Sequence, residues 1–136
     1  MEEIMNQIPA LNDFGIYFGI SIVFLALFQK IYGWVTPYDE WKLIKENNSA
    51  AAIAFAGAII GFTLALASAS AHSTSLTDFA IWSIIALIAQ VFAFSCIRLL
   101  MPKIVLRIEE NEIAAGITLC GLSIAVGIIN ASCMLA

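Results

Sequence analysis

Four polar side chains in otherwise apolar segments could line a path for a polar solute: Gln90, Asn130, Ser68 and Ser132. Amide and hydroxyl groups in an apolar environment need hydrogen-bond partners, because water is not there to supply them. Two interpretations follow. The groups bond between neighbouring helices, which we favour, or they line a polar route through the protein. The sequence leaves both open.

Residue types that perform catalysis are sparse. His72 is the single histidine, and the sequence has neither HxxxH nor CxxC spacing, so no metal site is predicted. There is no Ser-His-Asp arrangement and no glycine-rich phosphate loop. No charged residue lies in the middle of an apolar segment, which argues against proton- or sodium-coupled transport. We therefore expect no enzymatic activity and no cofactor.

Small residues recur at helical spacing in two apolar segments, as Gly57-x-x-x-Gly61 and Gly121-x-x-x-Ala125. Small residues four positions apart let membrane helices approach closely. We expect the two patterns to pack these segments against each other within one chain, and a seam between two copies of the chain is the alternative. In either case the role is helix packing.

A Glu-Asn pair stands before each of these segments, with Asn47 or Asn48 before the first and Asn111 before the second. Asparagine is a favoured N-cap because its side-chain oxygen accepts from a backbone N–H of the first turn, and losing it costs about 1 kcal/mol. We predict helix capping by Asn47 and Asn111. Anion binding at these helix starts is the alternative, which the neighbouring Glu46 and Glu110 disfavour.

The composition places these residues in a membrane. Of 136 residues, 62% are hydrophobic and 12% are charged, about half the charged fraction of a soluble domain. Long apolar runs predict an all-α membrane protein, a single domain over 1–136 with four transmembrane helices. Their expected ranges are about 13–35, 49–71, 79–100 and 113–136, after a short acidic lead. A net charge of −4 without a basic patch indicates no nucleic-acid partner.

The second half of the chain repeats the first. Residues 46–70 and 110–134 match at nine of 25 positions. Each repeat, about 13–72 and 78–136, holds one span, a short amphipathic connector and a small-residue span. Because two spans return the chain to its starting side, we expect the two repeats to run parallel, related by an axis along the membrane normal.

Each connector is predicted to hold a short helix in the membrane interface, the first starting at Thr36-Pro37. All basic residues border the two connectors: Lys30, Lys42, Lys45, Arg98, Lys103 and Arg107. Basic loops stay on the cytoplasmic side. We therefore expect both connectors to be cytoplasmic and both termini to be periplasmic.

Three elements of the chain together resemble a known family. They are Pro37-x-x-Glu40-Trp41-x-Leu43-Ile44-Lys45-x-Asn47-Asn48-x-Ala50-Ala51, then Arg98-Leu99-x-Met101-Pro102, and Asn130-Ala131-x-Cys133-Met134. The chain is similar to the YjfL-type inner-membrane proteins, which carry the domain of unknown function 350. This resemblance implies a bacterial inner-membrane protein with four spans and two copies of that domain. It supplies no activity, cofactor or catalytic residue. Relatives tend to be encoded near phage-shock-like peripheral membrane proteins, which implies a cytoplasmic peripheral partner.

Two functional hypotheses follow. The first is a non-enzymatic structural or partner-docking protein of the inner membrane, with the connectors as its contact surface. The alternative is a small channel or permease for ions or small polar solutes. Four spans rarely enclose a pore alone, so the alternative requires a homo-oligomer. The lipid bilayer is a partner under both.

Overall fold

The computed structural model describes residues 1–36 and 39–134, and these residues form six helices. The helices are α1 (Glu2–Val35), α2 (Glu40–Lys45), α3 (Ser49–His72), α4 (Leu76–Leu100), α5 (Ile104–Glu109) and α6 (Ile113–Ser132). Four of them, α1, α3, α4 and α6, are long and apolar enough to cross a membrane. The predicted all-helical fold is confirmed, and its four long apolar helices are candidate membrane spans. The short helices α2 and α5 lie in the two connectors.

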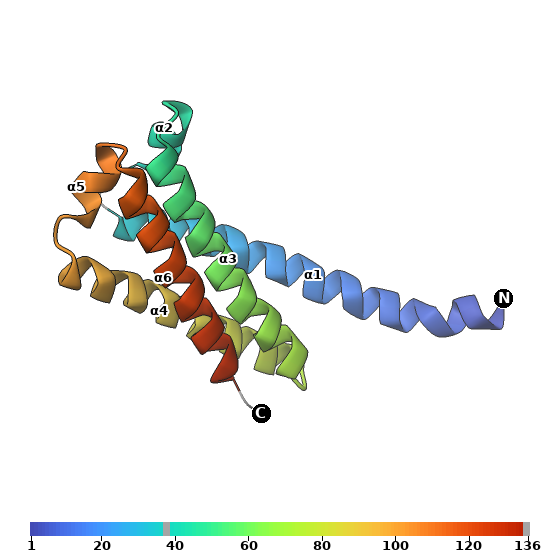
Figure 1. Cartoon of the computed structure of the whole chain (residues 1–136). Coiled ribbons are helices and arrows are strands. Elements are labelled where there is room, and N and C mark those ends of the chain that lie inside the picture. Colours follow the sequence, from blue (N-terminus) through green and yellow to red (C-terminus); the bar gives the residue numbers. More distant parts are fainter. Residues whose placement is uncertain (37–38, 135–136) are drawn as a thin grey trace.

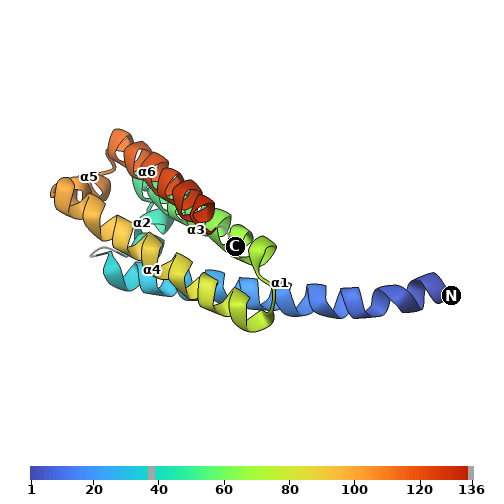
Figure 2. The same cartoon turned by 90° about the horizontal axis from the view of Figure 1, so that it is seen from below.

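The long helices form two layers, with α3 and α6 side by side in one and α1 and α4 in the other (Figures 1 and 2). Helices α3 and α6 run parallel, because contacts between them advance along both chains together. Gly57 of α3 faces Cys120 of α6, and farther on the Ser68 hydroxyl donates to Ala131 O at 2.9 Å. Both connectors therefore lie at the same end of the molecule.

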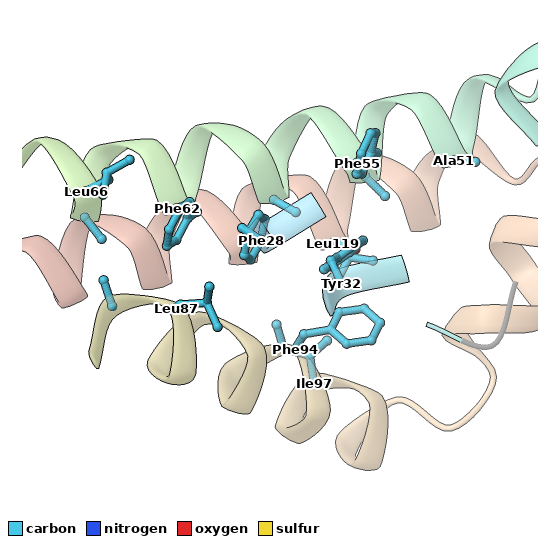
Figure 3. Close-up of a cluster of buried hydrophobic side chains, with 14 of the residues drawn as sticks. Phe28, Tyr32, Ala51, Phe55, Phe62, Leu66, Leu87, Phe94, Ile97 and Leu119 are labelled. Carbon is cyan, nitrogen blue, oxygen red and sulfur yellow. The ribbon is translucent and has the colours of Figure 1, made fainter. Parts of the chain in front are cut away.

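An aromatic cluster joins the two layers (Figure 3). The ring of Phe28 stacks on Phe62 with centroids 4.5 Å apart, and Tyr32 lies between Phe55 and Phe94 at 5.9 and 5.1 Å. Aromatic pairs at such distances contribute about 0.5–1.5 kcal/mol beyond their buried area. Phe28 and Tyr32 are the buried residues of α1, and Tyr17 stacks on Phe79 of α4 with centroids 5.1 Å apart, so this helix contacts the others from Tyr17 onward.

The helix α1 is longer than the sequence predicted. The expected acidic lead is helical from Glu2 onward, with Pro9 inside the helix. Glu2 and Glu3 occupy the first turn, where the helix dipole favours negative charge. At 1.5 Å per residue the 34 residues span about 51 Å, well beyond a hydrocarbon core of about 30 Å. The N-terminal part accordingly extends past the other helices (Figure 1).

The first connector helix begins later than predicted. Thr36 ends α1, since its backbone N–H bonds to Tyr32 O at 2.9 Å. The N-cap of α2 is Asp39, whose carboxylate accepts from the Lys42 N–H at 3.3 Å. Pro37, the predicted first helical residue, lies outside the described residues. The expected cap at Thr36 is therefore wrong, because its hydroxyl lies within hydrogen-bonding distance of the α1 carbonyl of Tyr32 and of the Glu40 carboxyl group.

Candidate functional site

Glycines bring α3 and α6 into backbone contact. A methyl group at Gly57 would overlap the backbone of Cys120, and one at Gly61 would overlap the carbonyl of Ser123. On α6 the facing glycines are Gly116 and Gly127. Such proximity maximises dispersion contacts where the hydrophobic effect does not drive helices together.

The structure places the second small-residue pattern elsewhere than predicted. A methyl group at Gly121 would meet no atom within 4 Å, and Ala125 is exposed on the same side of α6. Residues 116, 120, 123 and 127 share the face that meets α3, and positions 121 and 125 lie off that face. The expectation that Gly121 and Ala125 pack against α3 is corrected: Gly116 and Gly127 fill that role.

Asn47 and Asn111 close the connector helices. Both have left-handed backbones, with φ of 62° and 60°, which asparagine tolerates better than most residues. After α2, the N–H of Asn47 bonds to Ile44 O at 3.0 Å and that of Asn48 to Leu43 O at 2.9 Å. The equivalent bonds after α5 join Asn111 N–H to Ile108 O at 3.0 Å and Glu112 N–H to Arg107 O at 2.9 Å. Each connector therefore ends in the same Schellman motif.

The predicted N-caps differ from those observed. Asn48, rather than Asn47, caps α3, and its side chain accepts from Ala51 N–H at 2.9 Å. The N-cap position of α6 is held by Glu112, which makes no capping bond. Asn111 instead contributes to capping α3, in the other half of the chain, because its Oδ1 accepts from the N–H of Ala50 at 3.0 Å. The left-handed turn explains the shift, since it places each Glu-Asn asparagine one residue before the N-cap position.

Asn48 also joins the two halves. Its Nδ2 donates to Ile108 O at 2.9 Å and to Glu109 O at 3.3 Å, both at the end of α5. Together with the bond from Ala50 to Asn111, this makes a reciprocal pair of asparagine ties between the connectors. Asn48 is buried, so its amide is expected to contribute more than an exposed one would.

Three of the four polar residues singled out from the sequence bond between helices. Gln90 is 4% exposed and donates to Ser123 O at 3.0 Å. Asn130 donates to Ala86 O at 3.1 Å, and Ser68 bonds to Ala131 O. Ser132 is exposed and bonds within its own helix, to Ile128 O at 2.9 Å. The structure therefore brings Gln90, Asn130 and Ser68 into helix contacts, and leaves Ser132 outside them.

A pocket that the sequence did not predict lies between the end of α1 and the start of α2. Its volume is about 620 Å³, and its lining consists of Ala26, Gln29, Lys30, Gly33, Trp34, Thr36, Asp39, Glu40 and Trp41. Glu40 is 4% exposed. Its Oε1 is hydrogen-bonded to the Thr36 hydroxyl, and its Oε2 lies beside Gly33. This end of the molecule thus holds a buried carboxyl group.

Burial raises the pKa of Glu40 above its ordinary value, because desolvation disfavours the carboxylate, and the nearby charge of Asp39 acts in the same direction. The hydrogen bond from Thr36 opposes this effect in part. The Thr36 oxygen also lies 2.9 Å from Tyr32 O. A threonine has one hydroxyl proton, so it donates either to an α1 carbonyl, Tyr32 O or Gly33 O, or to the Glu40 carboxylate. A protonated Glu40 can donate to Thr36 in the first case, and an ionised Glu40 accepts in the second.

Sequence reasoning missed Glu40 because it treated the first connector as an interfacial helix whose charged residues face water. The available signal was local. Thr36 and Glu40 are four residues apart on either side of Pro37, and Glu40 adjoins Trp41. The described residues contain no group of three or more His, Cys, Asp or Glu side chains placed to hold a metal ion.

Comparison with known proteins gives one coherent result. The family described as "Domain of Unknown Function (DUF350)" matches residues 3–134 in one match, where two copies were expected. The chain is 38% identical over 130 residues to the UPF0719 inner membrane protein YjfL of Escherichia coli (strain K12), covering 96% of this chain and 98% of that protein. It is 24% identical over 124 residues to the UPF0719 transmembrane protein YshE of Bacillus subtilis (strain 168), covering 90% and 92%. No solved structure matches.

Proposed function

Because the chain belongs to the DUF350 family and is a multi-pass inner-membrane protein, we propose that it is a non-enzymatic docking protein whose two connectors form one contact surface. We name this surface the connector platform and define it as residues 39–46 and 103–112. The partner proposed is a cytoplasmic peripheral membrane protein.

The asparagine ties carry the proposal. Asn48 donates to the end of α5, and Asn111 accepts from the start of α3. Two connectors far apart in sequence are thereby held at a fixed separation. A fixed surface binds with a smaller entropic cost than two independent loops. The platform presents exposed side chains of both signs: Lys42, Lys45, Glu46, Lys103, Glu109, Glu110 and Glu112.

Two further features support the cytoplasmic placement of the platform and the parallel arrangement of two repeats. The basic residues stand at or near the connector end of the molecule, which favours that end being cytoplasmic and the termini periplasmic. The parallel course of α3 and α6 and the matching turns at Asn47 and Asn111 are what two parallel repeats would produce.

The topology is tested by labelling single cysteines in intact cells. Native Cys96, Cys120 and Cys133 are replaced by serine, and one cysteine is introduced at Lys103 or at Ser73. A membrane-impermeant maleimide is expected to label position 73 and to leave position 103 unlabelled until the cells are lysed. Labelling of position 103 from outside would overturn the cytoplasmic assignment.

Docking is tested by photo-crosslinking in cells from positions 45 and 103, with position 73 at the opposite end as the matched control. A discrete adduct is expected from the platform positions and none from the control. Neutralising the exposed charges of 39–46 and 103–112, with Glu40 retained, is expected to abolish the adduct. An adduct that survives this change, or its absence at both platform positions, would refute the proposal.

The alternative of an oligomeric channel or permease has less support. Gln90, Asn130 and Ser68 bond to backbone carbonyls of neighbouring helices within one chain. Groups engaged in this way are less available to replace the hydration shell of a solute. Flux of ions through liposomes containing a verified oligomer would restore this alternative.

A further inference from the structure

The pocket between α1 and α2 combines opposite charges at the membrane surface. We propose that it binds the zwitterionic head group of an amine phospholipid, in which a primary ammonium is linked to a phosphodiester. Glu40 and Asp39 would receive the ammonium and Lys30 the phosphate. This site does not rest on the docking proposal, since it needs no protein partner, although Asp39 and Glu40 lie within the range that defines the connector platform.

The position of the pocket favours a lipid. It lies where α1, a membrane span, ends at Val35. Trp34 and Trp41 line it and are 73% and 54% exposed. Exposed tryptophans concentrate at the level of lipid head groups, where the indole ring contacts both apolar chains and polar groups. A pocket of about 620 Å³ at this depth adjoins the head-group layer.

The acidic side of the pocket suits an ammonium group. Glu40 is buried, and Thr36 is its hydrogen-bonded side-chain partner among the described residues. Its Oε2 lies beside Gly33, near the carboxyl end of α1, where the unpaired carbonyls give the helix dipole its negative pole. Asp39 adds a second carboxylate at the rim. An ammonium placed here offsets the desolvation of Glu40 and gains charge-assisted hydrogen bonds.

The basic side of the pocket suits a phosphate. Lys30 is exposed and stands one turn before the end of α1, where its long side chain reaches the head-group level. Gln29 lines the same region and adds an amide donor. The pocket thus presents one cation and two acids, which disfavours an anionic head group that has no ammonium.

The second connector shows what this site requires. Its cavity, about 330 Å³, is lined by Met101, Pro102, Lys103, Ile104 and Arg107, with no acidic side chain among them. When Pro37 of the first connector is aligned with Pro102 of the second, Val105 stands where the first half has Glu40, and Met101 where it has Thr36. The second half therefore retains basic groups and lacks the ammonium-binding side. The site belongs to the first half.

The test measures lipid retention by native mass spectrometry of the full chain, reconstituted with phosphatidylethanolamine, its N-methylated derivatives, phosphatidylcholine or phosphatidylglycerol. Methylation removes N–H donors one at a time and leaves the protein unaltered. Wild-type protein is expected to retain phosphatidylethanolamine at least about tenfold better than phosphatidylcholine or phosphatidylglycerol, a ratio equivalent to about 1.4 kcal/mol. Equal retention of all these lipids would overturn the proposal without reference to any variant.

Single substitutions locate the site. Glu40→Gln is expected to lower retention of phosphatidylethanolamine about tenfold, and Lys30→Gln to weaken retention through the phosphate. Glu46→Gln, an exposed carboxylate on the same connector, is the control and should leave retention unchanged. If Glu40→Gln does not fold, Asp39→Asn gives the same test at the rim. Retention unchanged in Glu40→Gln and Asp39→Asn would refute the assignment.

A second experiment, with a soluble ligand, distinguishes a membrane lipid from a free phosphodiester as the source of this head group. Glycerophosphoethanolamine, added to protein in a lipid-free detergent, is expected to quench tryptophan fluorescence only at millimolar concentration, because it lacks the acyl chains. Binding of this soluble compound as tight as that of the lipid would overturn the assignment to a membrane lipid.

Discussion

The two halves of this chain share a sequence pattern but not an environment. In the first half, Gly57 and Gly61 are buried against α6, whereas their counterparts Gly121 and Ala125 are exposed. In the first connector a buried Glu40 lines a polar pocket, whereas Val105 occupies the equivalent place in the second. The difference shows that a repeated pattern specifies which segments become helices and turns, and leaves the neighbours of each residue unspecified.

Where the halves do agree, the agreement lies in the backbone. Asn47 and Asn111 adopt the same left-handed turn after helices of six residues each. Local hydrogen bonds determine such a turn, so two segments with the same local sequence pattern both form it. Contacts between helices depend on both partners. Because α3 and α6 pack against each other, each of them has a different neighbour, and equivalent residues need not face the same surroundings. The following four predictions test this distinction, beginning with the largest expected effect.

Replacing glycines by a larger residue should lower the stability of the protein at the α3–α6 contact and leave it nearly unchanged at Gly121. Gly61→Val and Gly127→Val place a side chain where backbone atoms already stand, and each is expected to destabilise the protein by about 3 kcal/mol or more. Gly121→Val has open space and should change the free energy of unfolding by less than about 0.5 kcal/mol. Equilibrium unfolding in detergent measures both. A large effect at Gly121 in the monomer would contradict the asymmetry.

The N-cap residues of α3 and α6 should also differ in how much they contribute to the free energy of unfolding. Asn48→Ala removes the cap on Ala51 and the bonds to the end of α5, and is expected to cost about 2 kcal/mol. Glu112→Ala, its counterpart, removes one exposed ion pair with Arg107 and should cost less than about 0.5 kcal/mol. The same unfolding measurement applies. Equal costs would show that the two helix starts are equivalent.

The left-handed asparagines allow a finer comparison. Asn47→Gly should be nearly neutral, because glycine adopts positive φ without strain. Asn111→Gly should cost about 1 kcal/mol, because it also loses the bond to the Ala50 N–H. Asn47→Ala should cost about 1 kcal/mol from backbone strain alone. If both glycine variants were neutral, the tie between Asn111 and α3 would have no energetic role.

The smallest expected effect is the change of protein stability with pH that Glu40 causes. Its raised pKa means that the folded state binds a proton more tightly than the unfolded state, whose carboxyl keeps its ordinary value of 4.5. This contribution to stability is therefore full below pH 4.5 and is lost as the pH rises through the folded-state pKa. Glu40→Gln should flatten the dependence of thermal unfolding on pH in a detergent free of amine lipids. Identical pH profiles for the two proteins would contradict the shift.

The ends of the helices could be predicted where a local signal marks them. The starts of α3 and α6 follow the Glu-Asn pairs, and the predicted ranges of both spans agree with the observed helices to within a few residues. The start of α1 was missed because no residue between Glu2 and Asp13 terminates a helix, and Pro9 is accommodated within it. The pocket at Glu40 was missed because burial of a charged connector residue depends on how α1 and α2 meet.

The sequence by itself determined that four apolar helices and two short connectors form, because helix length, turn chemistry and hydropathy are properties of neighbouring residues. Only the tertiary structure decided that Gly127 rather than Gly121 meets α3, and that Glu40 is buried. The physical reason is that the lipid-spanning helices are apolar on nearly every side. Their hydropathy therefore does not fix the rotation of each helix about its own axis. Close packing of small residues and hydrogen bonds between side-chain amides and backbone carbonyls select that rotation.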